Sequence, residues 1–380
     1  MKRTKRLAWL AGAAATALAV TLAPAAPAAA DGPQVTVEVV VEGLNVPRGL
    51  TYDAALGRVL IAEAGVAAEN NGACAAGFGG SRYCYGESGS IYQYSENWWL
   101  PSRRIVTGLP SIWAPDIAPI GYEVVLGIHD VALPFGTGSP VAVFGLSGPL
   151  SFRDELASHH PKARYLATAS LVITGNHIIE LADFAEYEEN VNPHPAFIDT
   201  NPYGVTTDGL DVVVADAAGN FIARRDLFGR VSTLAVIPDY IDETGDNWEG
   251  VPMSVTVGPD GAYYIGELSA AFSPAPNARI WRLDRQGNLS LVVEGLYDTS
   301  SITFDEQGRM IVLQFANDYY PGGREGKLLR VEQDGSITTL LDGLHTPGGV
   351  IHVGNGVFYV TNHSASLGGN GQLLRVTVTG

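Results

Sequence analysis

Acidic side chains stand at the ends of three short apolar runs that are typical of β-strands. These side chains are Glu63, Asp216 and Glu267. Carboxylate oxygens are the ligands that Ca²⁺ and other hard divalent cations prefer. If the fold brings the ends of these strands together, the three carboxylates predict a metal site, with Ca²⁺ or another divalent cation as the candidate cofactor.

Six further polar residues border the predicted strands and are candidate ligand-binding residues. They are Arg48, His129, Asn201, Asp298, Gln314 and Asn362. His129 is followed by Asp130, a pair that suggests acid–base chemistry with the imidazole as proton carrier. Because adjacent strand residues face opposite ways, we expect His129 to face inward and Asp130 to pack into its sheet.

A purely structural interpretation of the same residues stays open. In that interpretation Arg48 pairs with Glu63, and the other polar side chains satisfy backbone groups of the loops, as buried polar atoms must. The two interpretations differ in one observable: whether the carboxylates converge on one point or separate into independent contacts.

The elements that carry these residues form a repeat. Residues 253–257, 262–267, 278–283 and 289–293 are four β-rich runs joined by turn sequences such as Gly258-Pro259-Asp260-Gly261. The unit recurs at a period near 50 residues, which is typical of the four-stranded blades of a β-propeller. Short helical signal is confined to residues 182–188.

Six such units can be counted, so the predicted fold is all-β, a six-bladed β-propeller formed by residues 31–380 as one domain. The units begin near Pro47, His129, Asn201, Pro252, Ser300 and Pro347. The last unit lacks a fourth strand, and residues 35–44 supply a spare one. We therefore expect the first strand to complete the last blade, which protects the edges of an open sheet.

The N-terminus predicts export. Residues 1–30 combine a basic start, an apolar stretch and the small-residue sequence Ala28-Ala29-Ala30, the pattern of a secretory signal peptide cleaved before Asp31. The protein is then secreted or periplasmic, with no membrane span after cleavage. A membrane anchor is the alternative, although the apolar stretch is short for a bilayer.

The net negative charge of the chain limits the classes of molecule that it is expected to bind. The chain has 40 acidic and 23 basic residues, a formal net charge of −17. Such a surface repels phosphate backbones, so we expect no nucleic-acid partner. A small molecule or a protein is the expected partner of a monomeric chain.

Two cysteines, Cys74 and Cys84, lie in a Gly-rich stretch. In an oxidising compartment we expect them to form a disulfide. They are too few for a zinc site without a histidine cluster nearby.

Several segments resemble the ScyD/ScyE family of exported bacterial propeller proteins. The most specific are Asp199-Thr200-Asn201-Pro202-Tyr203-Gly204 and Gly266-Glu267-Leu268, and the likeness extends through nearly the whole chain after the signal. The resemblance implies an exported propeller. The family is associated with gene clusters for the pigment scytonemin, but it implies no settled catalytic mechanism.

Long connections are expected on one face of the propeller. All fall between the second and third strands of a blade or between consecutive blades, for example residues 65–89, 145–167 and 188–201. Loops on a rigid scaffold commonly form binding sites. The aromatics Trp98, Trp99, Trp113, Tyr319 and Tyr320 can stack on a sugar or planar ligand, or can belong to blade cores and edges.

Three functional hypotheses follow. The first is a secreted propeller that binds a small ligand or partner through the loop-insertion face, with no catalysis evident. The alternative is a divalent-metal-dependent lactonase- or esterase-type hydrolase at the tunnel mouth, which rests on analogy of fold. Oxidative chemistry on a pigment or polyketide rests only on the family association.

Overall fold

A computed structural model describes residues 32–67, 74–77, 80–115, 123–134, 138–195, 198–241, 245–268, 276–316 and 325–380. The predicted signal peptide, its cleavage site, Tyr319 and Tyr320 lie outside these residues. No helix in the described part of the chain is both long and apolar enough to cross a bilayer.

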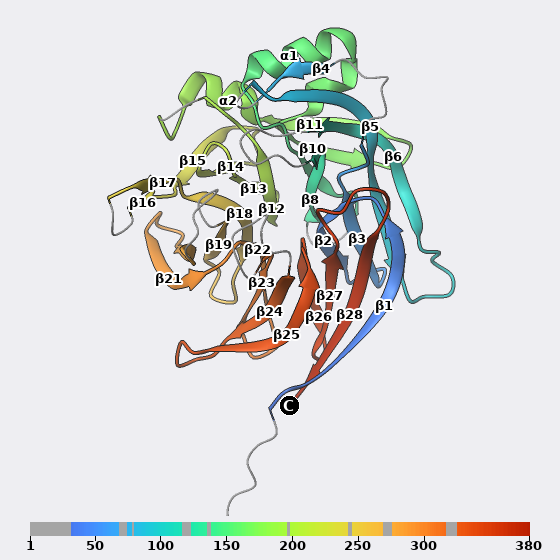
Figure 1. The fold of residues 1–380 in the computed structure, drawn as a ribbon, viewed down its shortest axis with the longest axis vertical. Coiled ribbons are helices and arrows are strands. Elements are labelled where there is room, and N and C mark those ends of the chain that lie inside the picture. The colour runs from blue at the N-terminus through green and yellow to red at the C-terminus, as the bar shows by residue number, and fades with distance from the viewer. Residues whose placement is uncertain are drawn as a thin grey trace, which may run out of the picture.

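Six antiparallel sheets follow one another around a central axis, which confirms the six-bladed β-propeller (Figure 1). Blade 1 contains β2 (Pro47–Asp53), β3 (Arg58–Glu63), β5 (Arg82–Ser95), β6 (Arg103–Ala114) and the short β7 (Val124–Leu126). Blade 2 contains β8 (Ile128–Ala132), β9 (Val141–Phe144), β10 (Thr168–Ile173) and β11 (His177–Asp183). Blade 3 contains β12 (Pro202–Asp208), β13 (Asp211–Asp216), β14 (Phe221–Arg225) and β15 (Val231–Val236).

The second half of the chain repeats the pattern. Blade 4 contains β18 (Val251–Val257), β19 (Tyr263–Leu268), β20 (Ala278–Leu283) and β21 (Leu289–Leu296). Blade 5 contains β22 (Thr299–Phe304), β23 (Met310–Gln314), β24 (Glu325–Val331) and β25 (Ile337–His345). Blade 6 contains β26 (Val350–Gly354), β27 (Val357–Asn362), β28 (Gly371–Thr379) and, as its outermost strand, β1 (Gln34–Leu44).

The first strand closes the ring, as the sequence predicts. In Figure 1, β1 runs beside β28, and the two pair antiparallel from Gln34–Thr379 to Leu44–Gly371. Leu44 is fully buried, together with Leu50 and Ile61 of blade 1 and Leu373 of blade 6. The closing strand therefore both completes a sheet and fills the apolar layer between the last blade and the first.

Apolar layers also separate the other blades. Facing surfaces of neighbouring sheets contribute Val, Ile, Leu and Phe side chains to each layer, such as Val213 and Ile222 of blade 3 against Val255 and Ile265 of blade 4. Alternation along each strand supplies one set of side chains to each neighbouring blade. The core is thus a ring of layers rather than one central cluster.

Turns between strands repeat one local chemistry. In the turn after β20, the Asp284 carboxylate accepts hydrogen bonds from the backbone N–H groups of Gln286 and Asn288 at 2.9 Å each, and Gly287 adopts φ +88°. The turn after β22 does the same with Asp305 and Gly308. The Asp side chain mimics a backbone turn, and the glycine that follows it adopts a positive φ without steric strain. Together they lower the free energy of forming a short hairpin.

The loop-insertion face carries the irregular structure. The ribbon β4 (Cys74–Ala76) pairs with β5, and the predicted Cys74–Cys84 disulfide is present between them. Helix α2 (Phe184–Val191) follows β11 near the predicted helical segment. Between β9 and β10 lie α1 (Leu150–His159) and a 3-10 helix (Pro161–Tyr165), which the sequence analysis does not anticipate.

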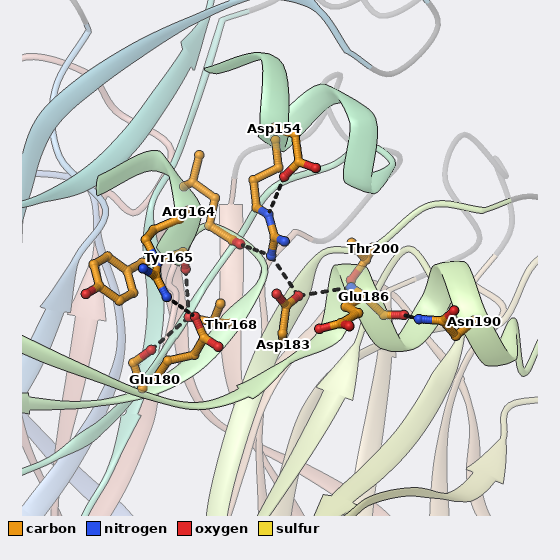
Figure 2. Close-up of polar contacts among 12 residues, drawn as sticks. Asp154, Arg164, Tyr165, Thr168, Glu180, Asp183, Glu186, Asn190 and Thr200 are labelled. Atoms are coloured by element: carbon orange, nitrogen blue, oxygen red, sulfur yellow. Dashed lines mark hydrogen bonds and ion pairs between the residues drawn. The ribbon is translucent and has the colours of Figure 1, made fainter. Parts of the chain in front are cut away.

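An ion pair connects helix α1 to helix α2. The Arg153 guanidinium of α1 donates to the Asp183 carboxylate at 2.7 Å, and the same carboxylate accepts from the Glu186 backbone N–H as the N-cap of α2. Figure 2 shows Asp183 between the two helices. The helices and the disulfide ribbon thereby form a rigid rim on one side of the insertion face.

Truncation of Leu44 to alanine tests ring closure. Because this side chain is fully buried between blades, the variant should lose about 2–5 kcal/mol of unfolding free energy. Val39 of the same strand is 46% exposed, so Val39→Ala should cost about 1 kcal/mol or less. Chemical denaturation measures both, and equal costs for the two variants would argue against closure by β1.

Candidate functional site

A pocket opens at the mouth of the propeller axis on the loop-insertion face. It has a volume of about 290 Å³ and is lined mostly by apolar side chains, among them Val46, Val125, Met253 and Phe315. We call it the mouth pocket. Its polar lining consists of Arg48, Glu123, Ser147, Asp199, Asn201, Tyr203 and Glu249.

The mouth pocket continues into the axial channel. The channel is a cavity of about 150 Å³ lined by the innermost strands of the blades, and the two cavities share Tyr203 and Met253. Ligand sites of propellers and barrels are commonly such concave, mostly apolar openings with a few polar groups. Of the predicted site residues, Arg48 and Asn201 line the mouth pocket and His129 lines the channel.

Arg48 places a buried positive charge in the lining of the mouth pocket. It is 7% exposed, and it donates to the Tyr203 hydroxyl at 2.6 Å and to the Val125 carbonyl at 3.1 Å. Its Nε has no hydrogen-bond partner, and among the described residues no carboxylate forms an ion pair with it. The expected pairing of Arg48 with Glu63 is wrong, because Glu63 pairs with Arg104 instead.

His129 and Asp130 both line the axial channel, so Asp130 does not pack into its sheet as expected. His129 is fully buried against the Tyr203 ring, with Nδ1 3.1 Å from the Pro202 carbonyl, whereas Asp130 stays partly exposed. Burial, and then the charge of Arg48, lower the pKa of His129 to about 3. The imidazole is therefore neutral at physiological pH and leaves Arg48 as the cation beside Tyr203.

Asp130 links the inner strands of blades 2 and 3 and lies close to Gly49 of blade 1. Its carboxylate accepts from the backbone N–H groups of Val131 and Val205, at 2.8 and 3.0 Å. A side chain at Gly49 would collide with it, since a Cβ there would lie 1.9 Å from Asp130 Oδ1. Burial raises the pKa of Asp130 to about 7.

Two of the predicted metal ligands are held by arginines of their own blades. Glu63 receives Arg104 Nε at 2.8 Å and Nη2 at 2.7 Å, together with the Ser90 hydroxyl at 2.6 Å. Glu267 receives Arg279 Nε at 2.7 Å and Nη2 at 2.8 Å, and Trp281 Nε1 at 2.8 Å. Bidentate pairing of this kind uses both carboxylate oxygens.

Asp216, the third predicted ligand, is fully buried and bonded to its own loops. It accepts from the Thr200 hydroxyl at 2.6 Å and from the backbone N–H groups of Asn201 and Gly219 at 2.8 and 3.0 Å. Within the described residues no group of three or more His, Cys, Asp or Glu side chains is arranged to hold a metal. Glu63, Asp216 and Glu267 thus do not form a common site there.

The residues that end the second strand of a blade share a structural role. Glu63, Asp216, Gln314 and Asn362 each accept a hydrogen bond from a backbone N–H just before the first strand of the same blade, at 2.7 to 3.1 Å. Asp298 adjoins one of these entries, and its backbone carbonyl accepts from Phe315 N–H at 2.7 Å. The prediction that such side chains satisfy loop backbone groups is confirmed for Asp216, Gln314 and Asn362, and Glu63 takes the same role although it was expected to pair with Arg48.

A buried acidic cluster lies behind the mouth pocket. Burial, and then the charges of Asp216 and Asp199, raise the pKa of Glu188 to about 8. Burial, and then Asp216, raise the pKa of Asp199 to about 7. Glu188 Oε2 and Asp199 Oδ1 have no hydrogen-bond partner. Carboxyl groups in such surroundings keep their protons near neutral pH.

Sequence reasoning missed Tyr203, Asp199 and Glu249 as pocket residues. A signal for the first two was present, because both belong to the segment Asp199–Gly204 that carries the ScyD/ScyE resemblance. Only Asn201 of that segment was assigned a ligand role. Glu249 lies in an inter-blade connection without a comparable pattern.

Comparison with known proteins supports the fold. No protein-family model and no curated protein match the chain. Among solved structures, it is similar to a luciferin-regenerating enzyme at 11% identity and TM-score 0.50, over 91% of this chain and 97% of that one. It is also similar to virginiamycin B lyase from Staphylococcus aureus at 12% identity and TM-score 0.46, over 91% of this chain and 100% of that one. At 11% identity the likeness to the luciferin-regenerating enzyme shows the propeller fold alone, and the ScyD/ScyE resemblance stays a prediction.

The acidic cluster predicts a loss of stability as pH rises from about 4 toward 8. A carboxyl whose pKa is raised on folding contributes stability that is present below its unfolded pKa, near 4, and lost as pH rises through its folded pKa, here about 7 to 8. His129 has the opposite sign but acts only below about pH 6.5. The thermal midpoint should therefore decrease as the pH is raised from 6.5 to 8.5.

Variants of helix α2 provide the control. Glu188→Gln should flatten the decline, because it removes a buried group that must lose its proton. Glu189→Gln, an exposed change on the same helix, should leave the decline as in the parent. Equal slopes for the two variants in a pH series of thermal scans would contradict the assignment.

Two arginines of β20 test the structural role of Glu267. Arg279→Met leaves a buried carboxylate without its cation and should cost about 3–5 kcal/mol. Arg282 pairs with Asp260 in a solvent-exposed setting, so Arg282→Met should cost far less than Arg279→Met. Denaturant titration measures both, and similar losses would mean that Glu267 does not depend on Arg279.

Proposed function

We propose that this protein binds a small molecule in the mouth pocket, and that the molecule has an apolar body and an anionic oxygen group. The observation that carries the proposal is the buried Arg48 guanidinium, which lines this pocket without an ion pair among the described residues. A buried cation that lacks a counter-ion is costly. A carboxylate or similar oxyanion of a ligand would relieve that cost.

The surroundings of Arg48 favour a defined orientation of the ligand. The Tyr203 hydroxyl and the Val125 carbonyl hold two nitrogens of the guanidinium, which limits its motion and preorganises it for binding. The neighbouring His129 is neutral at physiological pH, so it does not compete as a second cation. Arg48 is therefore the natural anchor for an oxyanion.

The other polar groups of the pocket favour a hydrogen-bond donor on the ligand. Asp199 and Glu249 also line the pocket, and Asp199 Oδ1 lacks a partner. A ligand hydroxyl or amine can donate to these carboxyl groups. The best-fitting ligand class is thus a compact apolar molecule with an oxyanion and a donor at separate positions.

A metal-dependent hydrolase at the tunnel mouth is the alternative from the sequence, and Ca²⁺ or another divalent cation stays its predicted cofactor. The partners of Glu63 and Glu267 favour a structural role for both side chains. If the hydrolase hypothesis is correct, EDTA should lower the thermal midpoint and added Ca²⁺ should restore it, because a metal that binds only the folded state stabilises it.

We also propose that binding takes place after export. The signal-like pattern of residues 1–30 supports export, and the Cys74–Cys84 disulfide is compatible with an oxidising compartment. The ligand would then be met in the periplasm or outside the cell.

Calorimetric titration with 6-hydroxy-2-naphthoate tests the binding proposal. This compound carries an oxyanion and a donor on opposite ends of an apolar body, whereas 2-naphthol lacks the carboxylate. We expect saturable binding of the first compound and at least tenfold weaker binding of the second. Arg48→Met should weaken binding of 6-hydroxy-2-naphthoate at least tenfold and remove its advantage over 2-naphthol.

A second arginine variant controls for general loss of charge. Arg330 is 8% exposed and ion-paired with Glu332 at 2.7 Å, away from the mouth pocket. Arg330→Met should change the affinity less than threefold. Unchanged binding of 6-hydroxy-2-naphthoate by Arg48→Met would count against the proposal. So would a failure to bind any of three probes: the two naphthalene compounds and decanoate, a simpler apolar carboxylate.

A further inference from the structure

A second polar cavity lies on the face opposite the loop insertions, at the junction of blades 6 and 1. It has a volume of about 250 Å³, and three tyrosines line it. We call it the tyrosine pocket. Its aromatic and polar lining consists of Tyr52, Tyr94, Tyr359, Ser95, Glu96, Asn97, Asn355 and Arg375. None of these residues lines the mouth pocket or the axial channel.

The tyrosine pocket presents fixed hydrogen-bonding groups. The Tyr359 hydroxyl donates to Glu96 Oε1 at 2.8 Å, and Arg375 Nε lies 3.3 Å from the same oxygen. Their side chains are nevertheless partly open to solvent, at 57% for Glu96 and 34% for Arg375. The ring of Tyr94 packs edge-on against that of Tyr359. The carboxylate and the guanidinium are therefore positioned but still accessible, whereas Tyr359 is buried behind them.

Two exposed tryptophans follow the pocket residues Glu96 and Asn97 in the chain. Trp98 is 94% exposed and Trp99 is 53% exposed, on the β5–β6 connection that follows Glu96 and Asn97. The Asn97 amide donates to the Leu56 carbonyl at 3.0 Å and so holds this connection against the β2–β3 turn. Large exposed aromatic side chains contribute nothing to the core and commonly mark a binding surface.

We propose that the tyrosine pocket, together with Trp98 and Trp99, is a carbohydrate-binding site. Indole and phenol rings can stack on the apolar C–H faces of sugar rings, and an amphipathic aromatic ring suits a ligand that is apolar on one side and wet on the other. The Glu96 carboxylate accepts from sugar hydroxyls, while Arg375 and the two asparagine amides donate to them. The combination matches a neutral saccharide.

Lipid fits the same surface less well. Acyl chains would leave the carboxylate, guanidinium and amide groups of the pocket without partners, which is unfavourable. The chain's net charge of −17 also repels anionic membranes. A neutral polyhydroxylated ligand meets neither obstacle.

The site has room for more than one sugar unit. A neighbouring cavity of about 430 Å³ lies at the junction of blades 5 and 6 and shares Asn355 with the tyrosine pocket. Its lining is rich in hydrogen-bonding groups, including Glu306, Gln307 and Arg309. The two cavities lie on either side of the β26–β27 turn, so we infer an oligosaccharide or polysaccharide rather than a monosaccharide.

A polysaccharide retention assay on the full chain tests this site. The protein is incubated with insoluble cellulose, chitin and xylan and applied to a glycan array, and hits are titrated with the matching tetrasaccharide by intrinsic fluorescence. We expect saturable binding to at least one glycan. Replacing both tryptophans by alanine, or making Glu96→Gln, should weaken it at least tenfold with little change in thermal midpoint.

Matched controls separate this site from other surfaces. Phe228 is 87% exposed on the β14–β15 turn of the same face, and Phe228→Ala should leave glycan affinity within twofold. Arg48→Met should also leave it unchanged, which separates this inference from the proposed function of the mouth pocket. No glycan binding, or binding unchanged in the double tryptophan variant, would overturn the proposal. Sedimentation with phosphatidylcholine vesicles in place of glycan binding would assign the surface to membranes instead.

Discussion

The pairing of β1 with β28 is the interaction on which the rest of the structure depends. It supplies the fourth strand of blade 6 and places Leu44 in the apolar layer shared with blade 1. A propeller whose ring is open would expose that layer and two sheet edges. Closure also positions the innermost strands around one axis, and the axial channel and the mouth pocket are consequences of that arrangement.

Ring geometry explains why residues that look like a metal site have other tasks. In four blades the end of the second strand lies beside a backbone N–H that precedes the first strand and needs an acceptor. Carboxylates and amides perform this task at Glu63, Asp216, Gln314 and Asn362. Arg48 differs because its hydrogen bonds go to Tyr203 and Val125 and leave its charge uncompensated by any described carboxylate.

The two faces of the propeller offer different chemistry. The insertion face combines an apolar pocket with one cation and a set of carboxyl groups, which suits a compact amphiphilic ligand. The opposite face has tight turns, and its accessible groups are tyrosines, tryptophans and paired charges at the blade junctions.

Local sequence determined the blades, the six-fold repeat, the closing strand and the disulfide, because each depends on short-range alternation, turn chemistry or spacing. Helix α1 could not be predicted from local sequence: it has no side-chain N-cap, and its position rests on the burial of Phe152 and Leu156 and on the ion pair between Arg153 and Asp183, thirty residues apart. Tertiary structure also decided which arginine neutralises Glu63. The sequence suggests Arg48, but the fold brings Arg104 to the carboxylate from β6, two strands away from β3 in the same sheet. The candidate site follows from that choice, since a binding cation is one that folding leaves unpaired, and this is a property of contacts between distant strands.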